Sequence, residues 1–390
     1  MRHDLAAPGD RSFWLQDAGA KAVTEPLAGD AACDVAIIGG GYCGLWAALR
    51  LKEQAPDLQV TVLEADICGG GASGRNGGQV HSWFAEIDLL THLCGAQEAL
   101  ALCQATAEAI EELAALQASG SIDMDLRLDG WMWTASSKAQ EGAWDGAVSI
   151  CRAGGENRFD DLSAAEIKAR SGSGASYTGV VEPRAGTVHP AKLALGLRAL
   201  ALAKGVTIHE KTPVLDIAAG APCALHTAGG TLRAGKVVIA TNAWASAIPE
   251  IRRYMYVVDS LIIATEPLAE RLDSLGWTGG ESICDSQSHV LFYQRTPAGR
   301  VIFGRGSGHV AYGNRPTAAF NRPPAGQDDN IRELHRLYPG LADARIDYDW
   351  GGPIDCMAEH LPVFGHLTGQ PNIFFGVGFN GTGIAQAPVA

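Results

Sequence analysis

The sequence has 390 residues, 47% of them hydrophobic and 19% charged, so it is long enough for two domains and too apolar for a disordered chain. A formal net charge of −13 excludes the basic footprint of a nucleic-acid-binding protein and is repelled by an anionic membrane surface. Nine cysteines without a C-x-x-C pair favour neither a disulfide framework nor a metal site. No apolar run is long enough for a membrane span or a signal peptide. We therefore expect a cytoplasmic protein.

Residues 1–30 are polar and irregular, and we expect them to be a lead-in outside the core. An apolar, β-branched run at 34–38 predicts a buried strand, and the glycines at 39–44 predict a turn. The stretch at 45–51 then predicts a helix, and a second strand at 60–63 closes on Glu64. Strand, glycine turn, helix and strand in this order are typical of a βαβ unit.

The rest of the chain contains two kinds of segment. Helical spacing marks 95–119 and 190–204, and strand-like runs follow at 206–209, 214–217 and 237–240. The segments 250–266, 288–304 and 345–350 instead alternate β-branched or aromatic residues with polar ones, as one-sided antiparallel strands do. This order predicts a Rossmann-like α/β domain interleaved with a second domain built on an antiparallel sheet.

The first glycine turn carries the spacing of a dinucleotide-binding site. Gly39, Gly41 and Gly44 fit G-x-G-x-x-G between a strand and a helix, where they permit a tight turn, close approach of a pyrophosphate and close packing of helix on strand. Glu64, at the end of the second strand, is placed to accept hydrogen bonds from ribose hydroxyls, and an acid there disfavours the 2′-phosphate of NADP. The alternative is a glycine-rich turn without a ligand.

A second glycine-rich run, from Gly69 to Gly78, follows directly and favours FAD over NAD. So many glycines cannot form a stable helix, so we interpret the run as backbone laid against something flat or anionic. A nicotinamide-binding domain would normally continue through another helix and strand at this point.

These segments resemble the FAD-dependent D-amino-acid-oxidase superfamily of amine oxidases, over residues 12–390. The run 72–78 resembles the loop along the flavin, 212–214 the strand at the adenine, 238–244 a strand end that returns to the cofactor, and 376–383 the closing loop at the flavin pyrimidine. The resemblance implies an FAD-binding domain of residues 31–82, 171–245 and 350–390, and a substrate-binding domain of residues 83–170 and 246–349. The FAD-binding residues that it implies are Gly39, Gly41, Gly44, Glu64, Ala65, Ala72, Ser73, Arg75, Asn76, Gly77, Gly78, Val214, Thr241, Asn242, Trp244, Gly378, Asn380, Gly381, Thr382 and Gly383.

Within the superfamily, the stretches 64–78 and 350–355 are most similar to γ-glutamylputrescine-oxidase-type proteins and aminophosphonate oxidoreductases. The resemblance implies oxidation of a small primary or secondary amine (amino acid, polyamine conjugate or aminophosphonate) to an imine that water hydrolyses, with the flavin reoxidised by O₂ or another acceptor. Two alternatives stay open: an FAD-dependent dehydrogenase of hydroxy acids or polyol phosphates that passes electrons to quinone, and a flavin-binding partner protein without chemistry of its own. Oligomeric state also stays open.

Four residues are candidates for the substrate side of the site. By resemblance Tyr293 faces the flavin and orients the substrate, and Arg305 binds an anionic substrate group, while Gln79 and His81 line the cavity. Each has a plainer alternative: a packed strand tyrosine, a surface arginine, or a structural histidine. Cys356 does not align with the cysteine that holds flavin covalently in sarcosine oxidases, so noncovalent FAD is favoured.

One departure from the family pattern lies at the end of the sequence. In relatives the closing loop precedes a long helix, whereas this sequence ends at Ala390, shortly after Gly383.

Overall fold

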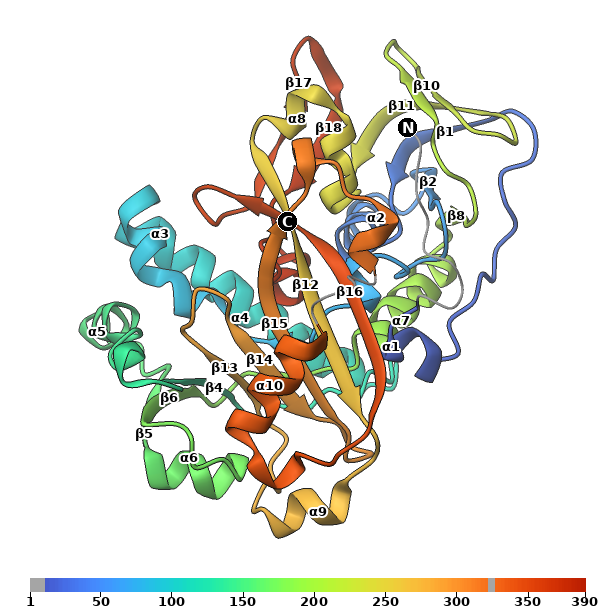
Figure 1. The fold of residues 1–390 in the computed structure, drawn as a ribbon. Helices are drawn as coiled ribbons and strands as arrows, with labels where there is room; N and C mark the ends of the chain where they lie inside the picture. Colours follow the sequence, from blue (N-terminus) through green and yellow to red (C-terminus); the bar gives the residue numbers. More distant parts are fainter. Residues whose placement is uncertain (1–10, 322–326) are drawn as a thin grey trace.

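The computed structural model describes residues 11–321 and 327–390, and its first sheet is built around the predicted βαβ unit (Figure 1). The strands β1 (Ala31–Ile38) and β2 (Val60–Leu63) are parallel, and α2 (Tyr42–Gln54) connects them. The strand order is β17-β18-β11-β1-β2-β8, with β17 (Val363–Leu367) antiparallel at the edge and with β18 (Gln370–Val377), β11 (Thr231–Ile239) and β8 (Thr207–His209) parallel to β1. An antiparallel extension of β9 (Asp216–Ala218) and β10 (Cys223–His226) continues from β11.

Helices cover one face of this sheet and a second apolar cluster covers the other, which explains why its central strands are apolar on both sides. Ile37 and Val62 are completely buried against Leu45 of α2 and Leu197 of α7 (Pro190–Ala203). The long helix α4 (Ala96–Ala118) and the short α11 (Gly383–Gln386) complete this layer. Buried parallel strands must be apolar throughout, as the sequence indicated.

The second sheet is almost entirely antiparallel, with the strand order β16-β12-β15-β14-β13-β4-β6-β5. Its strands are β16 (Ile346–Met357), β12 (Met255–Thr265), β15 (Val301–Val310), β14 (Leu291–Arg295), β13 (Ser282–Asp285), β4 (Trp131–Thr134), β6 (Thr178–Glu182) and β5 (Asp160–Ser163), and only the β13–β4 pair is parallel. The helix α10 (Gln327–Leu337) packs on one face of it (Figure 1). The predicted combination of a Rossmann-like sheet with an antiparallel sheet is therefore confirmed.

The two sheets interleave in sequence. The ranges 171–245 and 350–390, both predicted for the FAD-binding domain, each give a strand to the second sheet, β6 and β16 respectively. The far end of β16 nevertheless packs in the core of the first sheet through Met357. The division of the chain into two domains thus stays a proposal, because β16 belongs to both layers.

The lead-in requires a correction. Ser12 caps a short helix, α1 (Phe13–Asp17), whose first three residues are buried against Ile67, Ile262 and Trp350. This part of the predicted lead-in therefore belongs to the core, while residues 1–10 lie outside the described residues.

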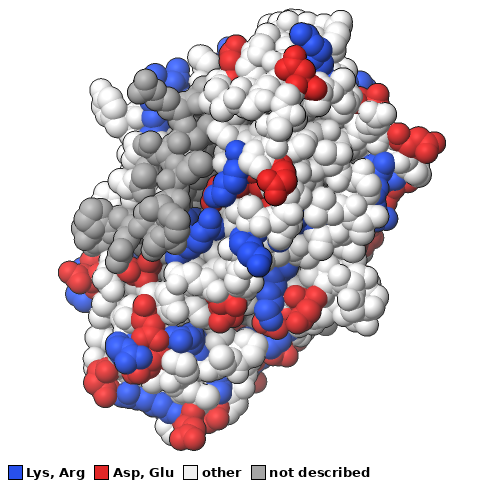
Figure 2. All heavy atoms as spheres, turned by 90° about the vertical axis from the view of Figure 1, so that its right-hand side faces the viewer, with Lys and Arg blue, Asp and Glu red and all other residues white. Residues whose placement is uncertain are grey.

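Several other elements differ from the prediction. The predicted strand at 250–266 begins as a turn of helix, α8 (Pro249–Arg252), and the helices α3 (Ile87–Cys94), α5 (Asp145–Ala153), α6 (Ala164–Ser171) and α9 (Ala269–Ser274) were not predicted. None of the described helices is both long and apolar enough to cross a membrane. On the face drawn in Figure 2, acidic and basic side chains are interspersed, so the net negative charge does not form a single-sign surface there.

Candidate functional site

The glycine turn after β1 has the geometry that a dinucleotide phosphate needs. A Cβ on Gly44 would lie 2.0 Å from the Gly39 carbonyl oxygen, and one on Gly39 would lie 2.4 Å from that of Ala240. Gly41 caps α2 without a side chain, and the amide of Tyr42 donates to Ser73 Oγ at 2.9 Å. The start of α2 is therefore bare backbone, which favours an anionic group.

Glu64 stands at the end of β2, beside this turn. Its Oε2 accepts a hydrogen bond from the Gly40 amide at 2.7 Å, and its Oε1 accepts one from the Asp66 amide at 2.8 Å. Burial raises the pKa of Glu64 to about 7. Each oxygen keeps a lone pair for another donor. Val214, which is buried, lies just beyond the segment in which the Thr212 amide donates to the Glu64 carbonyl.

The glycine-rich loop, residues 69–78, is fastened from behind by α1. Ser12 Oγ donates to the carbonyl of Gly74 at 2.5 Å, and Trp14 Nε1 donates to that of Asn76 at 2.9 Å. Both donors belong to the segment that the sequence marked as a lead-in. No sequence signal links residues 62 positions apart in this way.

The second sheet fastens the same loop through two further side chains. Trp350 Nε1 donates to the carbonyl of Arg75 at 2.7 Å, and Gln294 Nε2 donates to that of Gly77 at 2.5 Å. Four consecutive carbonyls, 74 to 77, thus accept from side chains of three different elements. Arg75 itself is buried and donates to the carbonyls of Gly70 and Gly351, so it holds the loop and is not a solvated surface arginine.

The opposite side of the loop is open. Among the described residues, the amides of Gly71, Ala72, Ser73 and Gly77 have no hydrogen-bond acceptor, and a Cβ on Gly71 would meet nothing within 4 Å. Free amides beside the start of α2 fit the pyrophosphate and ring of a flavin nucleotide.

Two more predicted segments converge on this place. Asn242 follows β11 in a left-handed conformation with φ 48°, and its buried Oδ1 has no hydrogen-bond partner. The closing loop, residues 376–383, has positive φ at Gly378, Asn380 and Gly381. Thr241, Trp244, Thr382 and Gly383 lie in the same two segments and are partly exposed. The residues present therefore fit FAD, because the glycine cradle and the free amides would gain partners.

Tyr293 and Arg305 are not where the sequence placed them. On β14, Phe292 and Gln294 face the glycine-rich loop, and a Cβ on Gly77 would lie 2.7 Å from the Phe292 ring. Because side chains alternate along a strand, Tyr293 faces the other side, where it is buried among Trp277, Phe303 and Tyr338.

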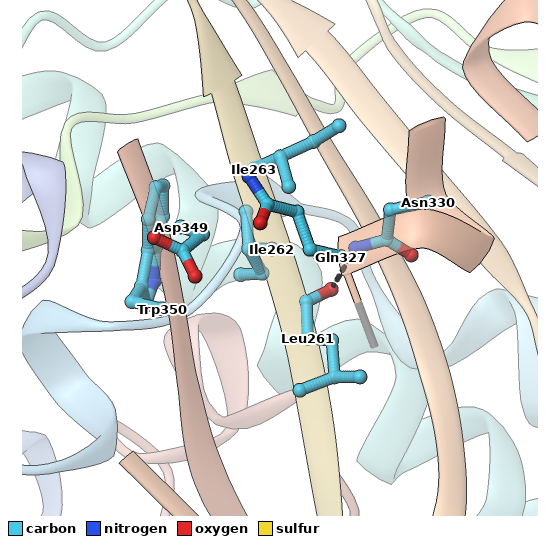
Figure 3. A pocket seen from close by; sticks show the side chains of 7 residues that line it. All are labelled: Leu261, Ile262, Ile263, Gln327, Asn330, Asp349 and Trp350. Carbon is cyan, nitrogen blue, oxygen red and sulfur yellow. Dashed lines mark hydrogen bonds between the residues drawn. The ribbon is translucent and has the colours of Figure 1, made fainter. Parts of the chain in front are cut away.

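Arg305 shares that far face. Its Nη1 donates to Asp329 of α10 at 2.8 Å, and Nη2 lies 3.1 Å from His289 Nδ1. A cavity between β12 and α10 has a volume of about 10 Å³ and is not lined by Arg305 (Figure 3). Neither residue faces the glycine-rich loop, so the expectations that Tyr293 faces the flavin and that Arg305 binds an anionic substrate group beside it are corrected.

Gln79 and His81 do lie beside the loop. Gln79, in β3 (Gln79–Val80), donates through Nε2 to the Ile283 carbonyl at 2.9 Å. The His81 ring stacks on Trp131, with 4.6 Å between ring centroids, and burial lowers its pKa. Both side chains thus contact the flavin-side face of the second sheet.

That face is an aromatic wall made of Trp131, Trp133, Cys284 and Phe292. Burial raises the pKa of the Cys284 thiol, and the charges of Asp285 and Glu86 add to this, so the Glu86 carboxylate lies near the wall. Burial also raises the pKa of Glu86 itself to about 7. Sequence reasoning missed Glu86, since a single acidic residue at the end of a short turn belongs to no recognisable sequence motif. A larger cavity of about 260 Å³ lies elsewhere, between α4 and Pro183.

Known proteins resemble this chain over nearly its whole length. The family model "DAO: FAD dependent oxidoreductase" matches residues 34–390. γ-Glutamylputrescine oxidoreductase of Escherichia coli is 30% identical over 97% of this chain and 86% of its own length, and glycine oxidase of Geobacillus kaustophilus is 30% identical over 91% and 90%.

Solved structures agree on the fold. The crystal structure of glycine oxidase from Geobacillus kaustophilus superposes with a TM-score of 0.72 at 21% identity, covering 92% of each chain. L-α-Glycerophosphate oxidase from Mycoplasma pneumoniae, solved with FAD bound, gives 0.69 at 14% identity and also covers 92% of each chain. With a cradle that fits FAD and a family match from residue 34 to residue 390, the chain belongs to the DAO family of FAD-dependent oxidoreductases.

Proposed function

We propose that the protein uses noncovalent FAD to oxidise a small primary or secondary amine. The observation that carries the proposal is the aromatic wall opposite the glycine-rich loop, where Phe292 packs on Gly77 and continues into Trp131 and Trp133. An amine must lose its proton before it can give up its α-hydrogen, and a dry, apolar wall favours the neutral form. Two relatives named for amine substrates, γ-glutamylputrescine oxidoreductase and glycine oxidase, support the same substrate class.

FAD held by the glycine cradle would supply the acceptor for two electrons and the α-hydrogen of the amine, and water would hydrolyse the resulting imine to a carbonyl compound and a smaller amine. The protein supplies position and environment. Four side chains hold the loop rigid, and the wall excludes water from the reacting carbon. Burial lowers the pKa of His81, which favours its neutral form and so weakens any repulsion of an incoming ammonium group.

The predicted match between Arg305 and an anionic substrate group is not part of the proposal. Arg305 is paired with Asp329 on the far face, and two acids, Glu86 and Glu182, lie near the wall, whose own residues include no lysine or arginine. We infer that a positively charged or neutral amine is favoured over one with a phosphonate. The absence of a cation among the wall residues gives no support to a polyol-phosphate dehydrogenase either.

Noncovalent attachment is supported by the chemistry of Cys356. Burial raises the pKa of its thiol to about 12, so the nucleophilic thiolate is scarce at neutral pH. If acid precipitation left the flavin on the protein, this part of the proposal would be wrong while the oxidation itself would stand.

The test is anaerobic bleaching of the flavin band in the FAD-loaded protein. The panel contains glycine, sarcosine, γ-glutamylputrescine, benzylamine and 2-aminoethylphosphonate, with lactate and glycerol 3-phosphate as the alternative class. Bleaching by an amine, with carbonyl product equal to the flavin reduced, supports the proposal. Bleaching only by lactate or glycerol 3-phosphate, or by nothing in the panel, would overturn it. Oxygen consumption in air then decides between O₂ and another acceptor.

A further inference from the structure

Asp355 joins the two cofactor segments that lie farthest apart in the sequence. It stands near the end of β16 and is completely buried. Its Oδ1 accepts from Asn242 Nδ2 at 2.6 Å, its Oδ2 accepts from the Gly378 amide at 2.6 Å, and its own carbonyl accepts from the Asn380 amide at 3.1 Å. One carboxylate thus ties the turn after β11 to the closing loop.

The negative charge of Asp355 is balanced by neutral donors alone. In the part of the chain that the structure describes, no lysine or arginine forms an ion pair with it, although a buried carboxylate without a cation is costly. Burial raises its pKa to about 7.

The titratable neighbours do not change this balance. Cys43, in the first turn of α2, and Cys356, the next residue of β16, both feel the charge of Asp355, and burial raises the pKa of each thiol to about 12. Asp259 of the neighbouring strand β12 is ion-paired with His309 of β15. The groups presented by β18 and by the turn after β11 are the uncharged Gly378 amide and Asn242 amide.

A second observation shows where a proton would be accommodated. Asn242 Oδ1 is buried and has no partner, while its Nδ2 donates to Asp355. If Asp355 carries a proton on Oδ1, a half-turn of the Asn242 amide brings Oδ1 to accept that proton and gives the orphan oxygen its partner. The Asp355–Asn242 pair thus keeps its hydrogen bond in either charge state of Asp355, with one Asn242 atom, Oδ1 or Nδ2, left unpaired in each.

We propose that Asp355 is a positioning residue that anchors the closing loop and takes up one proton from solvent when two electrons enter the flavin. The inference rests on the FAD site of the proposed function. Reduction adds negative charge to the ring beside the closing loop, and an unpaired carboxylate behind that loop opposes it. The electrons come from the amine or from an added reductant, one proton goes to the flavin, and a second forms the O–H bond on Asp355.

The test is the pH dependence of the flavin midpoint potential, measured on the FAD-loaded protein by slow enzymatic reduction with a reference dye. For a two-electron couple, each proton taken up changes the equilibrium constant tenfold per pH unit, which is about 30 mV. In wild type we expect two protons, about 59 mV per pH unit above about pH 7, and in Asp355→Asn one proton, about 30 mV. Asp259→Asn, which removes another buried carboxylate from β12, should keep the wild-type slope.

Equal slopes in wild type and Asp355→Asn would overturn the inference. If Asp355→Asn does not retain FAD, a pH indicator in weakly buffered wild-type protein counts the protons taken up on photoreduction near pH 8. Two protons per FAD support the inference, and one overturns it. None of these measurements needs an amine, so failure to oxidise amines leaves the result intact, whereas a protein that binds no FAD would remove the proposed function together with the inference.

Discussion

FAD affinity should depend on pH through Glu64. The carboxylate already accepts the amides of Gly40 and Asp66, and burial raises its pKa from the ordinary 4.5 to about 7. Ribose hydroxyls that donate to it would stabilise its charged form, so FAD binding should lower this pKa. By linkage, affinity then falls as pH falls below about 7, where a proton competes with the ligand.

The magnitude follows from the two pKa values. If bound FAD restores the ordinary value of 4.5, the dissociation constant should rise about tenfold between pH 8 and pH 6, and about 70-fold between pH 8 and pH 5. Replacement by glutamine should abolish this dependence and weaken binding at pH 8, because each charge-assisted hydrogen bond contributes roughly 1.5–3 kcal/mol. Since Glu64 also accepts two backbone amides, the variant should unfold more easily as well.

The assay is titration of apoprotein with oxidised FAD, followed by quenching of flavin fluorescence at constant ionic strength. Asp66→Asn is the comparison variant, since Asp66 lies in the same turn and pairs with Lys211. Its charge adds to the raised pKa of Glu64, so this variant should keep the pH dependence, shifted to lower pH. A flat profile in wild type, or the same slope in Glu64→Gln, would refute the assignment of Glu64 to the ribose.

The remaining predictions concern the loop, the glycine turn and the far face of the second sheet. Trp14→Phe removes a donor to a buried carbonyl, so the free energy of unfolding should fall by about 1–3 kcal/mol and FAD should dissociate faster. Phe13→Leu, the control, keeps the donor. Equal FAD release rates in the two variants would contradict the role of α1. Gly44→Ala places a Cβ 2.0 Å from a carbonyl oxygen and should abolish FAD retention on gel filtration. The control Gly174→Ala, whose Cβ would have no atom closer than 4.0 Å, should retain FAD. Retention in both variants would show that the turn relaxes. Arg305→Ala breaks a half-exposed ion pair, so it should cost at most about 1 kcal/mol and leave the ratio of KM values for anionic and neutral amines unchanged; a selective rise for anionic amines would mean that the side chain reaches the substrate.

Much of the cofactor site could be predicted from the sequence because it consists of backbone. Gly39, Gly41 and Gly44 are required by contacts shorter than a Cβ allows, and such requirements leave glycines at fixed spacing between a strand and a helix. Glu64 is found by the same logic, at the end of the next strand. These features are local, so a single pass along the chain detects them.

The sequence could not decide which way a strand faces when both of its sides are buried. In β14, Leu291 and Tyr293 point to one face and Phe292 points, with Gln294, to the other, so both faces carry apolar or aromatic side chains. The alternation of residue types therefore does not show which face lies against which layer. The packing of α10 on one side and of the glycine-rich loop on the other gave Phe292 and Gln294 to the flavin and Tyr293 to the far core.

The same limit explains the residues that sequence reasoning missed. By itself the sequence determined a βαβ unit with a glycine cradle, a second antiparallel sheet and the family that combines them. Only the tertiary structure decided that Trp14 belongs to the flavin loop and that Asp355 joins two loops over a hundred residues apart. Their partners are distant in sequence, and those of Trp14 and of Asp355 Oδ2 are backbone groups that almost any sequence could supply, so the hydrogen bonds leave no local pattern. Only the packing of β16 and α1 against the cradle brings donor and acceptor together.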